Sequence, residues 1–209
     1  MARLLMISLL FVCISANSAQ EKNIFTRIFD PYKQAGLNSL TCEISISFDD
    51  SNMSALNPYI PNLILKFKKP ESFKLSYTLL PQTPEDVKTV VEQMMEQSFC
   101  KKDFIEFGSG LVALQKDFKI ASTKNTTTEI RINLTAATKN AIAQKMTVRL
   151  DKNYRMTGFE ADKDRVRQES AFTYITVGKF QMVDRIVNTT SEAGKKVNII
   201  VKYSKYKIN

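Results

Sequence analysis

Hydrophobic and polar residues alternate along most of the chain beyond residue 40. Ile44, Ile46 and Phe48 alternate with Ser45 and Ser47, which is the period of a strand that buries one face and exposes the other. Short loops with Asp, Asn and Gly separate the later segments, as between neighbouring antiparallel strands. The pattern predicts a meander with one apolar face. The same alternation recurs at residues 63–68, 73–78, 130–134, 146–150, 171–177, 180–187 and 197–203.

Two segments follow a helical period instead. Residues 22–36 carry apolar side chains at helical spacing, and Pro31 interrupts them. Residues 83–98 begin with Thr83 as a candidate cap and Pro84 at the first helical position. An apolar stripe then suits core packing, and its two adjacent methionines also suit a movable lid over an apolar cavity. The stripe consists of Val87, Val90, Val91, Met94 and Met95.

A sheet of this size with a single apolar face has to curl around that face or be covered. Two helices cover only part of it. We therefore expect an α+β fold, a curved antiparallel half-barrel closed by amphipathic helices, with an apolar cavity inside. The chain contains no internal repeat, linker or break in composition, so residues 20–209 are predicted to form a single domain.

The first nineteen residues differ from the rest. Arg3 precedes an apolar run from Leu4 to Ile14, and small residues follow. This is the layout of a cleaved secretory signal peptide, and the run is too short to span a bilayer. We predict that residues 1–19 are such a signal peptide, with the cut after Ala19 and with Ser18 and Ala16 as alternative positions. Because Val12 stands where a lipoprotein acylation signal has a small residue, we interpret Cys13 as part of the apolar run.

The composition excludes a large part of enzyme chemistry. The 209 residues contain no His, so a Ser-His-Asp triad, a Cys-His dyad and a His-ligated metal site are excluded. The sequence has no GxSxG, Walker or GxGxxG motif. Asp49–Asp50, Glu85–Asp86 and the pair Asp162/Asp164 fall in predicted loops or at a helix start, where solvation or capping accounts for them. We predict no catalytic residue, no metal and no cofactor, and therefore no enzyme.

Removal of the signal peptide leaves two cysteines, Cys42 and Cys100. In the oxidising compartment that an exported chain enters, such a pair is a disulfide candidate. Two separately buried thiols are the alternative. We expect the disulfide.

The formal net charge of the chain is +9. Five Lys and no acidic residue lie between Gly194 and Asn209, and Lys202 alternates with the apolar positions of that segment. This charge favours an anionic membrane surface or an acidic envelope protein as a partner. Lysines that protect a solvated edge strand are the alternative. No basic-aromatic module for nucleic acid occurs, and we expect a monomer.

Several segments resemble one known family. LILKFKKPESFKLSYT, with Lys69-Pro70 between two strands, carries most of the resemblance, and YKQAGLNSLTCEISISF, MTVRLDKNYRMTGFEA and the closing run from FTYITVGKF to YKIN add to it. Over most of residues 22–209, the chain resembles the periplasmic outer-membrane lipoprotein carriers, the lipoprotein-sorting (LolA/LolB-like) family. The resemblance implies about eleven strands in a half-barrel that carries acyl chains in the periplasm, with no catalytic residues.

The chain also departs from that family. Lys69 stands where the family has Arg, and the predicted helix Pro84–Ser98 and the region of Cys100 stand where the family has an Asp-Gly turn and a strand.

Two functions are compatible with these features. One is a carrier that binds the acyl chains of a lipoprotein or lipid and transfers them towards the outer membrane. The other is a non-enzymatic envelope interaction or sensor protein with a filled half-barrel and a basic partner-binding face. For the carrier, we expect the early strands to line the cavity beneath the helix. The candidate lining residues are Ile44, Ile46, Phe48, Leu63, Leu65, Phe67, Phe73, Leu75 and Tyr77 on the strands, and Met94 and Met95 on the helix.

Overall fold

The structure, a computed structural model, describes residues 24, 27–50, 53–70, 72–99, 118–137, 143–163 and 165–209. The predicted signal peptide, residues 1–19, lies outside them. The described residues form ten strands in one sheet. The strands are β1 (Ser39–Asp49), β2 (Leu63–Lys68), β3 (Ser72–Ser76), β4 (Phe118–Asn125), β5 (Ile130–Ala136), β6 (Lys145–Leu150), β7 (Met156–Lys163), β8 (Val166–Val177), β9 (Phe180–Glu192) and β10 (Lys195–Ile208).

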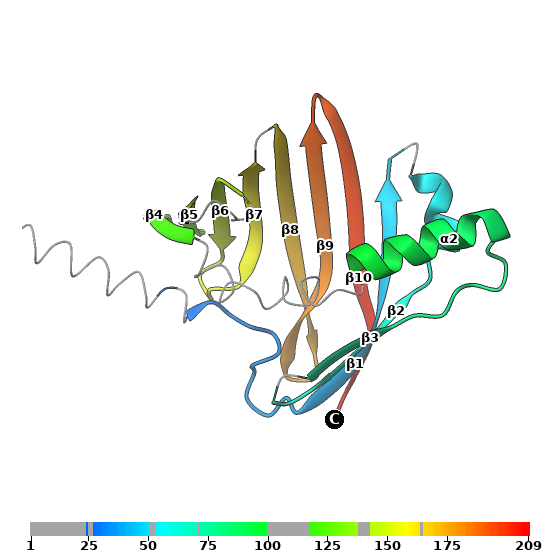
Figure 1. Cartoon of the computed structure of the whole chain (residues 1–209). Coiled ribbons are helices and arrows are strands. Elements are labelled where there is room, and N and C mark those ends of the chain that lie inside the picture. The colour runs from blue at the N-terminus through cyan, green and yellow to red at the C-terminus, as the bar shows by residue number, and fades with distance from the viewer. Residues whose placement is uncertain are drawn as a thin grey trace, which may run out of the picture.

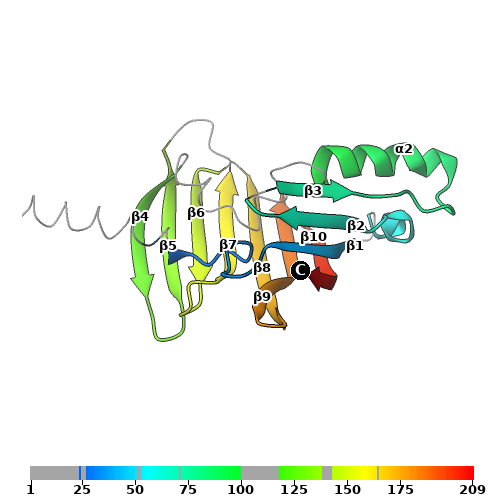
Figure 2. The same cartoon turned by 90° about the horizontal axis from the view of Figure 1, so that it is seen from below.

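The sheet is open and curled. Its order is β3-β2-β1-β10-β9-β8-β7-β6-β5-β4, so β3 and β4 are the two edges and the first strand pairs with the last (Figure 1). All neighbouring strands are antiparallel. Figure 2 shows β1–β3 running across the direction of β4–β7. The predicted curl is confirmed, with ten described strands where the resemblance implies about eleven.

The turns follow from local sequence. A two-residue loop joins β9 to β10, and both of its residues, Ala193 and Gly194, have positive φ (47° and 81°). Two positive φ values give a hairpin turn whose twist matches that of the flanking strands. The turn between β8 and β9 also has two residues, and there only the first, Gly178, has a positive φ (61°). The predicted antiparallel meander is therefore confirmed for β8–β10.

One α-helix lies beside the β1–β3 edge of the sheet (Figure 2). It is α2 (Glu85–Met94), and a π-helical turn, Met95–Phe99, continues it. The predicted cap is wrong: Pro84 is the N-cap, and its carbonyl accepts the amides of Val87 and Lys88, at 3.0 Å each. The hydroxyl of Thr83 is buried and has no hydrogen-bond partner among the described residues.

The helix predicted over residues 22–36 is largely wrong. Among the described residues helical geometry stops at Arg27, and residues 28–36 form turns. The carboxylate of Asp30 accepts the amide two residues further on (2.9 Å), and Pro31 has no amide with which to continue a helix. In the described part of the chain, no helix is long and apolar enough to cross a membrane.

Candidate functional site: the apolar inner face

Most of the large buried side chains of the sheet lie on one side of it, which we call the inner face. The strand register carries this face across the molecule, because residues directly opposite each other in antiparallel strands point to the same side. One row of paired residues shows the chemistry of the inner face: the row is apolar at both ends and polar at the centre. From β1 to β5 this row consists of Phe48, Ile199, Asn188, Ser170, Phe159, Val148 and Ile132.

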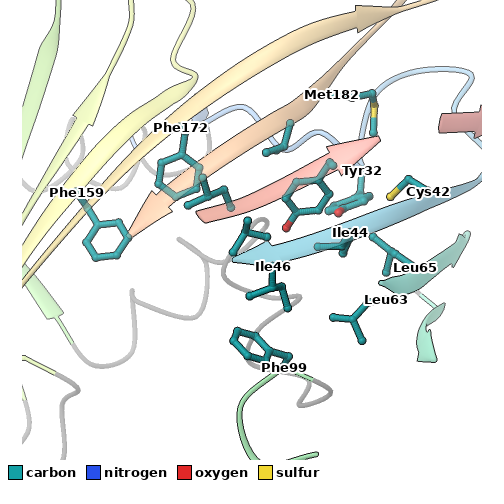
Figure 3. Close-up of a cluster of buried hydrophobic side chains, with 14 of the residues drawn as sticks. Tyr32, Cys42, Ile44, Ile46, Leu63, Leu65, Phe99, Phe159, Phe172 and Met182 are labelled. Atoms are coloured by element: carbon teal, nitrogen blue, oxygen red, sulfur yellow. The ribbon is translucent and has the colours of Figure 1, made fainter. Parts of the chain in front are cut away.

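The structure brings together the residues predicted to line a cavity. Ile44 lies opposite Leu63, and Phe67 lies opposite Phe73, so β1, β2 and β3 present them to the same core. Figure 3 shows Ile44 and Leu63 in this core. Exposure rises towards the edge strand. Ile44, Ile46, Phe48, Leu63, Leu65 and Phe67 are buried, whereas Phe73, Leu75 and Tyr77 are half-buried.

The end of α2 adds to this core. Val91 and Met95 are fully buried, and Met94 is half-buried. Phe99, at the end of the π-helical turn, is buried on the side towards which Ile46 and Leu63 point (Figure 3). The predicted stripe is thus inward-facing at these positions, whereas Val90 is 49% exposed.

A bulge in β10 turns two tyrosines onto the inner face. The pairing register shifts at Cys42 of β1, which lies opposite two residues of β10, Lys205 and Tyr206. Lys205 adopts φ 51°, and an extra residue of this kind re-aims the side chains beyond it. Tyr203 and Tyr206 therefore both pack into the core although they are three positions apart. The Tyr206 hydroxyl donates to the carbonyl oxygen of Val183 (2.5 Å).

Tyr32 and Cys42 lie beside these tyrosines. Burial raises the pKa of Tyr32, and the neighbouring Tyr203 raises it further. Burial also raises the pKa of the Cys42 thiol to about 12, so the group is a neutral thiol at physiological pH. Cys42 is free in the structure, and Cys100 lies outside the described residues. The expected Cys42–Cys100 disulfide is therefore not confirmed.

The segment that precedes β1 closes one end of the inner face. The ring of Tyr32 lies 5.2 Å from that of Phe67 and 4.9 Å from that of Phe73, between centroids. The side-chain amide of Gln34 donates to the carbonyl of Gln181 (2.8 Å) and accepts its amide (2.9 Å). Gln34 thus acts as a short piece of strand beside β9. No sequence pattern indicated this role, because the apolar spacing of residues 22–36 predicted a helix.

Asn57 protects β1 in the same way. Its side-chain amide donates to the carbonyl of Phe48 (2.9 Å) and accepts the amide of Phe48 (2.8 Å). Asn57 belongs to a 3₁₀ helix, Ser54–Tyr59. Pairing between β1 and β2 ends at Ile44, so this contact satisfies backbone groups beyond the ladder, as a buried strand edge requires.

The centre of the inner face is polar. The hydroxyl of Ser170 on β8 donates to the side-chain oxygen of Asn188 on β9 (2.5 Å). Ser170 is only 3% exposed, and the flanking residues of its row, Phe159 and Ile199, are apolar. No sequence pattern predicted this pair, because the strand residues around Ser170 do not alternate in polarity.

The carboxylates singled out in the sequence do not form a site. Asp162 lies on the outer face, opposite Lys145, and Asp164 lies outside the described residues. Asp49 is exposed in β1, and Glu85 and Asp86 occupy the first turn of α2. Across the described ranges, no group of three or more Cys, Asp and Glu side chains is placed to hold a metal.

No family model matches the sequence, and no curated protein matches it. Solved structures do match the fold. A domain assigned to outer membrane lipoprotein sorting from Vibrio parahaemolyticus is 11% identical, with a TM-score of 0.51 over 90% of each chain. A DUF1329 family protein from Desulfovibrio piger is 7% identical, with a TM-score of 0.51 over 90% of this chain and 93% of that one. In fold, therefore, the chain is similar to lipoprotein-sorting proteins, as the resemblance in its sequence implies.

Proposed function

We propose that the protein is a periplasmic, non-enzymatic carrier that binds the acyl chains of a lipoprotein or lipid inside a half-barrel and transfers them towards the outer membrane. The observation that carries the proposal is the inner face, on which strands from both halves of the sheet bury apolar side chains on either side of the central Ser170–Asn188 pair, with a methionine-containing helix end packed against it. Methionine side chains adapt to different neighbours at low cost. The shared fold with a lipoprotein-sorting domain supports the same assignment.

In this proposal, α2 is the element that moves. Leu63, Leu65 and Met95 are each at most 2% exposed, so an acyl chain reaches them only after the helix end withdraws. The entering chain replaces the contacts that the helix leaves. The Ser170–Asn188 pair supplies a polar contact for the ester or amide group at the head of the chain, since a buried carbonyl requires a hydrogen-bond donor.

The experiment is binding of a fluorescent fatty acid to the mature chain, residues 20–209, with thermal unfolding measured on the same samples. We expect the parent protein to bind, and Leu65→Glu to abolish binding while the protein stays folded, because withdrawal of the helix end would leave the new carboxylate in contact with water. Lys66→Glu, on the opposite face of the same strand, is the matched control and should bind like the parent. The mass of the exported protein tests the signal peptide: we expect the mass of a chain whose first residue is Gln20.

The alternative is an envelope interaction or sensor protein with a filled half-barrel. The observation in its favour is that most of the candidate lining residues are already buried without a ligand. In a filled core, Leu65→Glu places an unpaired carboxylate among apolar side chains, which costs several kcal/mol, roughly 3–5. Unfolding of this variant, together with no fatty-acid binding by the parent, would decide for the filled core and against the carrier.

A further inference from the structure

The outer face of the sheet carries unbalanced positive charge over β3, β2, β1, β10 and β9. Lys66 lies directly opposite Lys74, and Lys202 lies directly opposite Arg185. All four are exposed, and none has an ion pair to a described residue. Like charges in directly opposed positions destabilise a sheet. We define the basic face as Lys66, Lys68, Lys74, Arg185, Lys202 and Lys207.

The register assembles this face from distant parts of the chain. Thr41 of β1 pairs with Lys66 on one side and with Lys207 on the other. Together with Lys74, these residues form one row across β3, β2, β1 and β10 that contains three lysines and no acid. A second row places Ser45 beside the Lys202–Arg185 pair. The sequence separation between the early and late lysines hides this arrangement from any local pattern.

The carboxylates nearby are engaged elsewhere. Glu43, on the outer face of β1 between the two rows, binds the ammonium group of Lys205 at 2.9 Å. Asp184, in the bulge of β9, accepts the hydroxyl of Thr173 at 3.3 Å. Neither carboxylate has an ion pair with a member of the basic face.

We propose that the basic face docks the protein on an anionic phospholipid bilayer. Five of its six members are lysines. Lysine is a flexible point charge, whereas arginine is the usual choice for a fixed, bidentate contact with one carboxylate or phosphate. Hydroxyl side chains such as Thr41 and Ser45 lie between the lysines, which leaves a broad polar surface suited to many headgroups at once. Each such lysine strengthens partition to an anionic bilayer by about fivefold.

This docking is independent of the proposed cargo, because the basic face and the apolar inner face lie on opposite sides of the sheet. A protein with a filled half-barrel would dock equally well. An acidic protein partner would also complement the charge, and the experiment separates it from a bilayer.

The experiment measures co-sedimentation of the mature chain with vesicles that contain phosphatidylglycerol, and with pure phosphatidylcholine vesicles. Acyl chains are common to both, so a difference reports the headgroup charge. We expect binding to the anionic vesicles only, weakening as salt is added. Lys66→Gln/Lys74→Gln should weaken binding roughly 25-fold, at fivefold per lysine. It should also unfold at or above the parent's temperature, because it removes a repulsive pair.

Lys119→Gln/Lys124→Gln is the matched control. It removes the same charge from exposed positions on β4, the opposite edge of the sheet, and should bind within about twofold of the parent, since distant charges are screened. Equal binding of the parent to both vesicles would overturn the proposal, as would an equal loss in the control. Binding of the parent to polyglutamate but not to anionic vesicles would also overturn it, in favour of an acidic protein.

Discussion

The two halves of the outer face arrange their charges differently. On β7 and β8, Glu160 lies directly opposite Glu169, and Arg167 contacts both carboxylates, at 3.0 and 2.8 Å. On β5 and β6, Arg131 lies directly opposite Arg149. We call these five residues, with Glu129, the paired-charge face. The guanidinium of Arg131 is 2.5 Å from Glu129 and that of Arg149 is 3.9 Å from Glu160. Each opposed like-charge pair here has an opposite charge beside it.

The basic face contains opposed like-charge pairs without such partners. Lys66–Lys74 and Lys202–Arg185 repeat the geometry of Arg131–Arg149, but no carboxylate of the described residues has an ion pair with them. The same sheet therefore contains both arrangements, and its topology does not impose the unbalanced one. The basic face therefore costs stability through repulsion between like charges that the fold could have avoided, and the proposed docking on an anionic bilayer accounts for that cost.

The inner layers beneath the two faces differ as well. Among the described side chains of β4–β7, those that are buried carry no titratable group. Beneath the basic face, Tyr32, Cys42, Tyr203 and Tyr206 form a cluster whose pKa values are all raised, mainly by burial.

The difference between the two inner layers predicts a large loss of stability at alkaline pH. Burial raises the pKa of Cys42 from 9.0 to about 12, and the fold favours the neutral thiol. Above about pH 9 the unfolded chain ionises first, so stability falls as pH rises towards 12. Cys42 alone accounts for about 3 kcal/mol by pH 11, and the tyrosines act in the same direction. Hydrogen exchange at alkaline pH should rise in β1 and β10 before it rises in β5 and β6.

Cys42→Ala is the control for this prediction. Without the thiol, the fall of stability between pH 9 and 11 should be shallower than in the parent. Exchange that rises first in β5 and β6 would contradict the contrast between the two inner layers.

Sequence patterns predicted the fold better than the site. Alternation located β1, β2 and β5 because each buries every second residue. It missed β4, an edge strand with Phe118 as its only buried residue. It also missed the start of β8, because polar Gln168 and Ser170 occupy its inner positions.

The site depended on long-range contacts that no local pattern contains. The predicted lining residues do share one core, since a strand's period settles which side each residue faces. Gln34 and Asn57 act on strand edges that are adjacent only in the folded chain. The bulge at Lys205 likewise depends on pairing with β1, so the inward turn of Tyr206 has no signal in the sequence.

Gly158→Ala has the next largest expected effect and acts on the paired-charge face. A Cβ at this position would lie 2.4 Å from the carbonyl oxygen of Ser170 and 2.8 Å from the guanidinium of Arg149. The backbone has to shift, and we expect a loss of about 2–3 kcal/mol in chemical denaturation. Gly194→Ala is the control: no atom is near its Cβ and only its φ of 81° opposes the change, so about 1 kcal/mol is expected. Equal losses would show that the close approach of Ser170 and Arg149 to position 158 adds nothing to the cost.

Glu160→Gln would make the paired-charge face resemble the basic face. Glu160 is the carboxylate shared by Arg149 and Arg167, and the Nε of Arg149 is buried with no hydrogen-bond partner among the described residues. Removing the charge should lower the free energy of unfolding by about 1–2 kcal/mol. Glu169→Gln should cost under about 1 kcal/mol, because Arg167 keeps Glu160. Equal losses of stability in the two variants would show that Glu160 is no more important to the arginines than Glu169.

Lys66→Glu would make the basic face resemble the paired-charge face, and we expect it to change stability least. Lys66→Glu places a carboxylate directly opposite Lys74, so repulsion becomes attraction and stability should rise by about 0.5–1 kcal/mol at low salt. Lys74→Glu should give the same gain, whereas the double variant again opposes like charges and should return to the parent's stability. The coupling between the two sites measures the pair itself, because changes at each single site cancel in the cycle. Additive gains would mean that net charge, and not the opposed pair, determines the cost of the basic face.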